Sequence, residues 1–178
     1  MLKGAVALVT GAGQGLGRAT AHRLSKMGAN VVIADLSSDL AHKVVDELGG
    51  DKAMAAVLDV SSEDQVQAAM KDVTDRWGAP RVLVQCAGIA PPQKTVGRKG
   101  PHRLADYEKV LNVNTVGTFN VMRLVADAMQ HNEPDEHGCR GVVVNTASIA
   151  AMDGQVKIQH SSSIYTYIRL FTHSEPVC

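Results

Sequence analysis

The residues best placed to do chemistry are four glycines near the amino terminus, in the segment TGAGQGLG at residues 10–17. An apolar run at 5–9 precedes them, and helically spaced apolar side chains follow from Leu16 to Met27. Glycine lets the backbone turn sharply, and the free N–H groups at the start of a helix attract anions. The segment therefore predicts a buried strand, a phosphate-binding turn and a helix, in that order.

A carboxylate at the end of the second apolar run narrows the class of ligand that the predicted site could bind. Asp35 follows the run at 31–34, roughly 20 residues after the glycines, where dinucleotide-binding units place the acid that binds a ribose hydroxyl. The alternative role for Asp35 is a turn or helix cap, because Ser37, Ser38 and Asp39 follow it. A carboxylate at this position would repel the 2′-phosphate of NADP, so the sequence favours NAD.

The elements that must position these residues alternate along the chain. This alternation predicts an α/β fold, a Rossmann-type doubly wound parallel sheet, with its ligand beyond the carboxyl ends of the strands. Gly13, Asp35, Asp59 and Gly88 are expected to converge there. The predicted strands are 5–9, 31–34, 54–58, 81–84 and 141–148, and the predicted helices are 16–27, 39–48, 104–129 and a segment from a Ser61-Ser62 cap to Trp77.

Two polar features interrupt this pattern. Asn112 and Asn114 lie within the predicted long helix, where an amide is unfavourable unless it has a hydrogen-bonding task, although surface placement explains one of the two equally well. The segment 91–103 is basic, and it is either a solvated loop or a place where cations meet an anionic substrate at the mouth of the crevice. Its cations are Lys94, Arg98, Lys99, His102 and Arg103.

Composition excludes several classes of function. The chain has 178 residues with 18 basic and 18 acidic side chains, so it predicts one domain without a DNA-binding charge excess. No apolar run is long enough to span a membrane. Cys86, Cys139 and Cys178 lack metal-ligand spacing and are interpreted as ordinary thiols, with no metal site. The first strand begins so close to Met1 that no presequence is visible.

Several of these motifs together resemble the short-chain dehydrogenase/reductase family. They are the glycine segment, Asp35, Asp59, the CAGI stretch at 86–89, Asn114 and Ser148. The run at 117–148, with its extra loop, closely resembles the type-2 3-hydroxyacyl-CoA dehydrogenases, which are mitochondrial and are also called type-10 17β-hydroxysteroid dehydrogenases. The resemblance covers about residues 3–156.

The resemblance implies an NAD-dependent oxidoreductase that oxidises secondary alcohols of small molecules, either acyl-CoA or steroid substrates, as a mitochondrial homotetramer. It implies catalytic roles for Ser148, which would polarise the reacting oxygen, and Asn114, which would anchor a proton-relay water. Gln85 departs from the family, which usually has Asn there. The implied NAD-binding residues are Gly11, Gly13, Gln14, Gly15, Leu16, Gly17, Asp35, Asp59, Val60, Cys86, Ala87 and Gly88.

The resemblance stops after residue 156. The family's general acid/base tyrosine and its lysine partner would stand at positions 161 and 165, where this chain has Ser161 and Tyr165. We expect an NAD-binding domain at 1–156, a divergent tail at 157–178 with a strand over 164–172, and a C-terminally truncated fold that reflects splicing, a frameshift or a gene-prediction error. The hypotheses are an oxidoreductase with impaired turnover and, alternatively, a catalytically inactive NAD-binding fragment that acts through partners.

Overall fold

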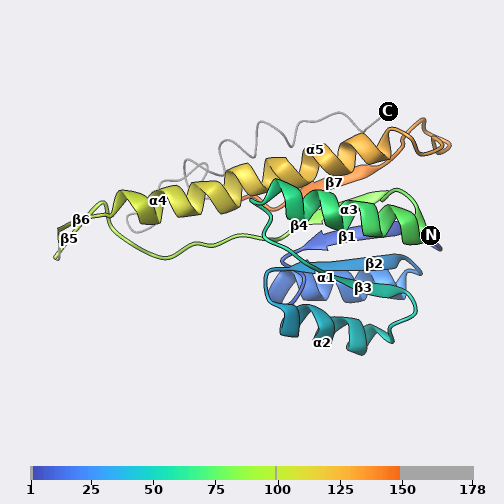
Figure 1. Ribbon diagram of the computed structural model, residues 1–178, viewed down its shortest axis with the longest axis horizontal. Coiled ribbons are helices and arrows are strands. Elements are labelled where there is room, and N and C mark those ends of the chain that lie inside the picture. Colours follow the sequence, from blue (N-terminus) through green and yellow to red (C-terminus); the bar gives the residue numbers. More distant parts are fainter. Residues whose placement is uncertain (1, 99, 149–178) are drawn as a thin grey trace.

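A five-stranded parallel sheet forms the centre of the molecule, with strand order β3-β2-β1-β4-β7 (Figure 1). The computed structural model describes residues 2–98 and 100–148. This sheet confirms the predicted doubly wound α/β fold. The strands are β1 (Val6–Thr10), β2 (Asn30–Asp35), β3 (Ala53–Val57), β4 (Val82–Gln85) and β7 (Val142–Asn145).

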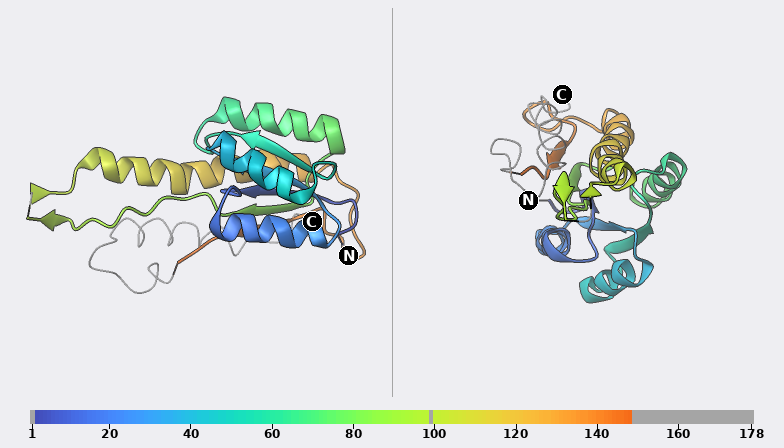
Figure 2. Two further views of the ribbon diagram at one scale, coloured as in Figure 1. Left: turned by 90° about the horizontal axis from the view of Figure 1, so that it is seen from below. Right: turned by 90° about the vertical axis from the view of Figure 1, so that its left-hand side faces the viewer.

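Helices cover both faces of the sheet (Figures 1 and 2). Side chains alternate along each strand, so Ala7 and Val9 of β1 pack in one apolar cluster, while Val6 and Leu8 pack in the other. The first cluster contains residues of α1 (Gly15–Lys26) and α2 (Ser38–Leu48), and the second contains residues of α3 (Glu63–Trp77) and α5 (Thr118–Met129). The central strands of the parallel sheet are therefore buried on both faces, as their Val-rich sequences require.

Local capping explains where two of the helices begin. The Ser37 hydroxyl accepts a hydrogen bond from the backbone N–H of Leu40 at the start of α2. Ser62 accepts one from Gln65 at the start of α3, which confirms the predicted serine cap. The first turn of α3 also carries Glu63 and Asp64, whose charges complement the helix dipole.

The predicted helix at 104–129 contains a wider turn than expected. The structure divides it into α4 (Leu104–Leu111), the π-helix η1 (Asn112–Gly117) and α5. Asn114 in η1 is buried at 3% exposure, and its amide bonds to the backbone of Ile89. The predicted hydrogen-bonding task is thus confirmed for Asn114, whereas Asn112 lies at the surface.

The basic segment before α4 is a hairpin rather than an irregular loop. Strands β5 (Val96–Gly97) and β6 (Gly100–Pro101) pair in antiparallel fashion. Figures 1 and 2 show this hairpin and α4 extending away from the sheet, beyond the carboxyl end of β1. Sequence patterns missed this hairpin because each of its strands has only two residues.

The edge strand β7 is shorter than predicted and ends at Asn145, not at Ser148. Among the described residues it pairs with β4 alone, and Val142 and Val144 are each 50% exposed. The predicted boundary at 156, Ser161, Tyr165, the strand at 164–172 and Cys178 all lie outside the described residues. In the part of the chain that the structure describes, no helix is long and apolar enough to cross a membrane.

A hydrogen-bonded turn leads from α5 into β7. Asp135 Oδ1 accepts the backbone N–H groups of Cys139 at 2.8 Å and His137 at 2.9 Å. These two bonds, the one from Cys139 foremost, hold the pKa of Asp135 below its ordinary value of 3.8. The ionised carboxylate is therefore the form that the folded turn favours.

We predict a pH-dependent stabilisation from this turn. A depressed carboxyl pKa stabilises the fold above the unfolded-state pKa near 3.8, and the effect is lost as the pH falls through the folded-state pKa. Asp135→Asn keeps an acceptor but removes the charge, so we expect it to melt below wild type at neutral pH and to converge with it in acid. Asp51→Asn, in an exposed turn, is the control; a difference between Asp135→Asn and wild type that persists unchanged in acid would contradict the assignment.

Candidate functional site

A cavity of about 710 Å³ opens beyond the carboxyl ends of the strands, within the range typical of small-molecule sites. It lies where parallel sheets of this topology bind ligands. The turns after β1, β2, β3 and β4 all contribute to its wall. The cavity is lined by Gly11, Gln14, Gly15, Leu16, Gly17, Ala34, Asp35, Leu36, Leu58, Asp59, Val60, Cys86, Ala87, Gly88, Ile89, Lys109, Val113 and Thr146.

The turn after β1 lies directly against the turn after β4. Gly11 has φ +62°, and a Cβ on it would lie 2.7 Å from the backbone nitrogen of Ala87. A Cβ on Gly17 would collide with the carbonyl oxygen of Gly11. The predicted glycine segment therefore fits because two backbone segments and the first turn of α1 approach too closely for side chains.

The start of α1 offers an anion-binding surface to the cavity. Gln14 precedes the helix and makes no side-chain cap hydrogen bond, and the first turn carries no acidic residue. The first N–H groups of the helix therefore keep their positive partial charge, which the macrodipole reinforces. A phosphate at this end of the cavity would meet these N–H groups.

Asp35 is held rigidly at the cavity wall. Its Oδ2 accepts the backbone N–H of Gly13 at 2.8 Å, and its Oδ1 accepts that of Ser37 at 3.0 Å. The turn-capping role and the cavity position are thus both observed for this one side chain. Gly13, which was expected in the crevice, does not line it; a Cβ there would lie 2.9 Å from Asp35 Oδ2, so Gly13 supports the carboxylate from behind.

Asp59 and Val60 form a second polar edge of the cavity. Asp59 Oδ1 accepts hydrogen bonds from both the N–H and the hydroxyl of Ser61, at 2.9 and 2.7 Å. The Asp59 N–H donates to Gln65 Oε1 at 2.8 Å. Within the described residues, Asp59 Oδ2 and the Val60 N–H take part in no hydrogen bond. An acceptor and a donor are therefore available side by side at the cavity wall.

The turn after β4 is fixed from two sides. The Ala87 N–H donates to Thr10 Oγ1 at 3.2 Å, and Asn114 binds both the N–H and the carbonyl of Ile89, at 2.9 and 2.8 Å. Asn114 does not line the large cavity but borders a smaller one of about 130 Å³ beside it. Cys86, Ala87 and Gly88 border both cavities.

Like Gly13, the predicted site residue Ser148 borders neither cavity. The residue of the β7 end that borders both cavities is Thr146, whose hydroxyl donates to the Gln85 carbonyl at 2.7 Å. The Gln85 amide in turn donates to Asn145 Oδ1 at 2.8 Å. Sequence analysis missed Thr146, and the only available signal was its place at the end of a predicted strand.

The basic hairpin does not reach the cavity through any of its described cations. Lys109 of α4 is the basic residue in the cavity wall, and its helical position gave no signal of this role. Arg103 lies 4.0 Å from Asp106 in an exposed ion pair. Among the described residues, no cluster of His, Cys, Asp or Glu could hold a metal ion.

Comparisons with a family model and with curated proteins all find dehydrogenases. The sequence model of the short chain dehydrogenase family matches residues 5–166. The 3-hydroxyacyl-CoA dehydrogenase type-2 of Drosophila melanogaster is 52% identical over 158 residues, which cover 88% of this chain and 62% of that protein. The human protein of the same name is 48% identical over 157 residues, covering 87% and 60% respectively. The chain thus spans about three fifths of the length of these curated relatives.

Solved structures show the same likeness. The crystal structure of 3-hydroxyacyl-CoA dehydrogenase type-2 from Mycobacterium avium matches with a TM-score of 0.85 at 38% identity, covering 93% of this chain and 65% of that one. The 3-ketoacyl-(acyl-carrier-protein) reductase from Brucella melitensis, complexed with NADH, matches with a TM-score of 0.84 at 28% identity, covering 97% and 68%.

The close approach at Gly11 yields a matched test. Gly11 and Gly15 both have positive φ, but a Cβ on Gly15 meets nothing within 4 Å. Gly15→Ala carries only backbone strain, about 1–2 kcal/mol, whereas Gly11→Ala adds a clash with backbone, a further cost of about 1–3 kcal/mol. Urea denaturation should therefore rank wild type above Gly15→Ala and Gly15→Ala above Gly11→Ala. Equal losses for the two variants would contradict the geometry.

Proposed function

Because this chain belongs to the short-chain dehydrogenase family, we propose that it binds NAD in the cavity at the carboxyl ends of its strands. The observation that carries this proposal is the placement of the uncapped start of α1 and the Asp35 carboxylate in one cavity wall. The N–H groups suit a pyrophosphate, and the carboxylate suits the hydroxyls of a ribose. The Brucella relative, whose structure contains NADH, supports the same ligand.

We propose that the site prefers NAD to NADP. Both Asp35 oxygens already accept backbone N–H groups, from Gly13 and Ser37, which hold the carboxylate in place. A 2′-phosphate would bring a second negative charge against this fixed one. The proposed cofactor-binding set remains the twelve residues that the sequence indicated, with Gly13 acting through Asp35.

We propose that the reaction of the family applies here: oxidation of a secondary alcohol of a 3-hydroxyacyl-CoA or hydroxysteroid, with hydride transfer to NAD when it is bound. The names of the Drosophila and human relatives support the acyl-CoA class. Ser148 is the proposed group that polarises the reacting oxygen. Asn114, which borders the smaller cavity, is the proposed anchor of a proton-relay water, and its two bonds to Ile89 fix its orientation. A homotetramer in mitochondria is proposed on the same kinship.

We further propose that this chain turns substrate over slowly. Ser161 stands where the family motif has its tyrosine, and the loss of a general acid/base costs about 10²–10⁴-fold in rate. The second candidate function, NAD binding without catalysis, rests on the same substitution. Oxidation of a 3-hydroxyacyl-CoA, followed through NADH absorbance, should fall at least about 100-fold below a full-length relative. A rate within tenfold of that relative would refute the slow-turnover proposal.

A thermal-shift measurement tests NAD binding itself. We expect NAD to raise the melting temperature of the full chain, by an amount equivalent to about 2.7 kcal/mol at a hundredfold excess over Kd. Asp35→Ala should abolish this shift because it removes the ribose acceptor. Asp39→Ala is the matched control, since Asp39 lies four residues later on the exposed first turn of α2 and does not line the cavity.

The measurement distinguishes failure of the role assigned to Asp35 from failure of the proposed NAD binding. An NAD-dependent shift that survives in Asp35→Ala would contradict the assigned role of this carboxylate. A wild-type chain that melts cooperatively but shows no shift with NAD would overturn the proposed function.

A further inference from the structure

A buried asparagine on α5 holds the turn that carries Asp59 and Val60. Asn120 is 6% exposed, and its Nδ2 donates a hydrogen bond of 2.9 Å to the carbonyl oxygen of Val60, which is 60 residues away in the chain. Val60 lines the large cavity, whereas Asn120 does not. The asparagine therefore acts on the cavity wall from behind.

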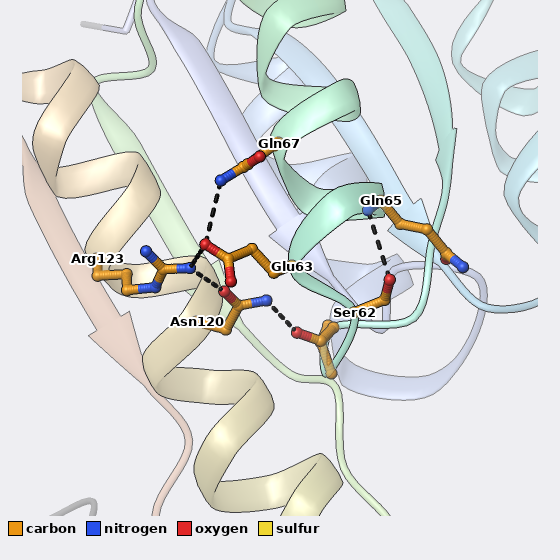
Figure 3. A network of polar contacts seen from close by, with 7 residues as sticks. Ser62, Glu63, Gln65, Gln67, Asn120 and Arg123 are labelled. Atoms are coloured by element: carbon orange, nitrogen blue, oxygen red, sulfur yellow. Dashed lines mark hydrogen bonds and ion pairs between the residues drawn. The ribbon is translucent and has the colours of Figure 1, made fainter.

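Arg123 fixes the orientation of this amide. Its Nη2 donates to Asn120 Oδ1 at 2.9 Å and to Glu63 Oε1 at 2.7 Å (Figure 3). Because a guanidinium can only donate, it selects the amide oxygen of Asn120 and leaves the NH₂ group to face Val60. Figure 3 also shows Gln67, which donates to the same Glu63 oxygen. The amide is thus anchored to both α5 and the first turn of α3.

The backbone of η1, which leads into α5, packs closely against Val60. A Cβ on Gly117 would lie 2.5 Å from Val60 Cγ2. Gly117 ends the π-helix η1, and Asn114 within η1 binds Ile89, which also lines the cavity. One helical rod therefore carries two buried asparagines, each bonded to the backbone of a different cavity turn.

The turn at Asp59 and Val60 presents a pattern of hydrogen-bond donor and acceptor that fits one base. Asp59 Oδ2 is an available acceptor and the Val60 N–H an available donor within the described residues. Adenine offers the complement, a 6-amino donor beside the N1 acceptor. Hypoxanthine reverses both, with an oxygen at position 6 and a proton on N1. The relative placement of Asp59 and Val60 therefore decides whether the site distinguishes the two bases.

We propose that Asn120, oriented by Arg123, is a positioning residue that sets the adenine selectivity of the cofactor site through the Val60 carbonyl. This inference rests on the proposed function, because it requires that the cavity bind NAD. It assigns to α5 a task that neither the glycine segment nor the strand-end carboxylates perform.

The test compares two cofactors on the full chain. NAD and nicotinamide hypoxanthine dinucleotide differ in the base alone, and titration calorimetry gives the Kd of each. We expect wild type to prefer NAD by about tenfold, the effect of one or two net hydrogen bonds. Asn120→Asp has nearly the same shape but, when ionised, cannot donate to Val60, so the preference should fall below about threefold. Arg123→Met should lose part of the preference for NAD.

Val125→Ala is the matched control, because Val125 is a fully buried residue of the same helix that does not line the cavity and has no side-chain hydrogen-bonding group. It should lower the melting temperature and keep the base preference, which separates positioning from general loosening of α5. A wild-type preference that survives in Asn120→Asp, or its loss in Val125→Ala, overturns the inference while leaving the proposed function intact. Equal affinity of wild type for both cofactors also overturns the inference, and failure of wild type to bind NAD overturns both.

Discussion

The close approach between the turns after β1 and β4 is the constraint on which the site depends. Thr10 and Gln85 pair in register at the ends of these strands, and the Cys86 N–H donates to the Thr10 carbonyl at 3.1 Å. With the strands locked together, the chain beyond them has no room for a Cβ at Gly11. The first turn of α1 and the segment at 86–89 both line the cavity.

The helical rod formed by α4, η1 and α5 is the second organising element. Asn114 and Asn120 are two of the few buried polar residues in the described chain. The side-chain amide of each donates a hydrogen bond to the backbone of a turn that lines the cavity. A buried amide is costly when unpaired and geometrically demanding when paired. Each bond therefore restricts a turn that local sequence alone would leave variable. The wider π-helical turn, η1, contains Asn114, which binds Ile89. It is followed in α5 by Asn120, which binds Val60.

The electrostatics of the cavity are divided along its length. Backbone N–H groups of α1 give positive potential near the glycine turn, while Asp35 and Asp59 place carboxylates on the neighbouring wall. Such a division suits a ligand with a phosphate group between polar, hydroxyl-bearing parts. Lys109 adds a cation from α4 to the lining of the same cavity. Ser148 borders neither cavity, and Thr146 is the residue after β7 that borders both.

Features that depend on near neighbours in the chain followed directly from the sequence. The order of the five strands of the main sheet and of the helices, the cap at Ser62 and the place of Asp35 at a strand end arise from apolar periodicity and hydrogen bonds within a few residues. Element boundaries shifted, by one residue for β3 and by three at the end of β7, because tertiary pairing decides where a ladder ends.

Contacts between distant residues were decided by the tertiary structure. Gly13 lies behind Asp35 because Leu40 and that carboxylate already fill the space beside it. The hydrogen bonds that join Asn120 to Val60 and Asn114 to Ile89 require the helices to be packed on the sheet. The sequence by itself determined a dinucleotide-binding type of fold and its strand-end residues; packing determined which of them reach the cavity and which hold others in place, because those choices depend on space and partners far apart in the chain.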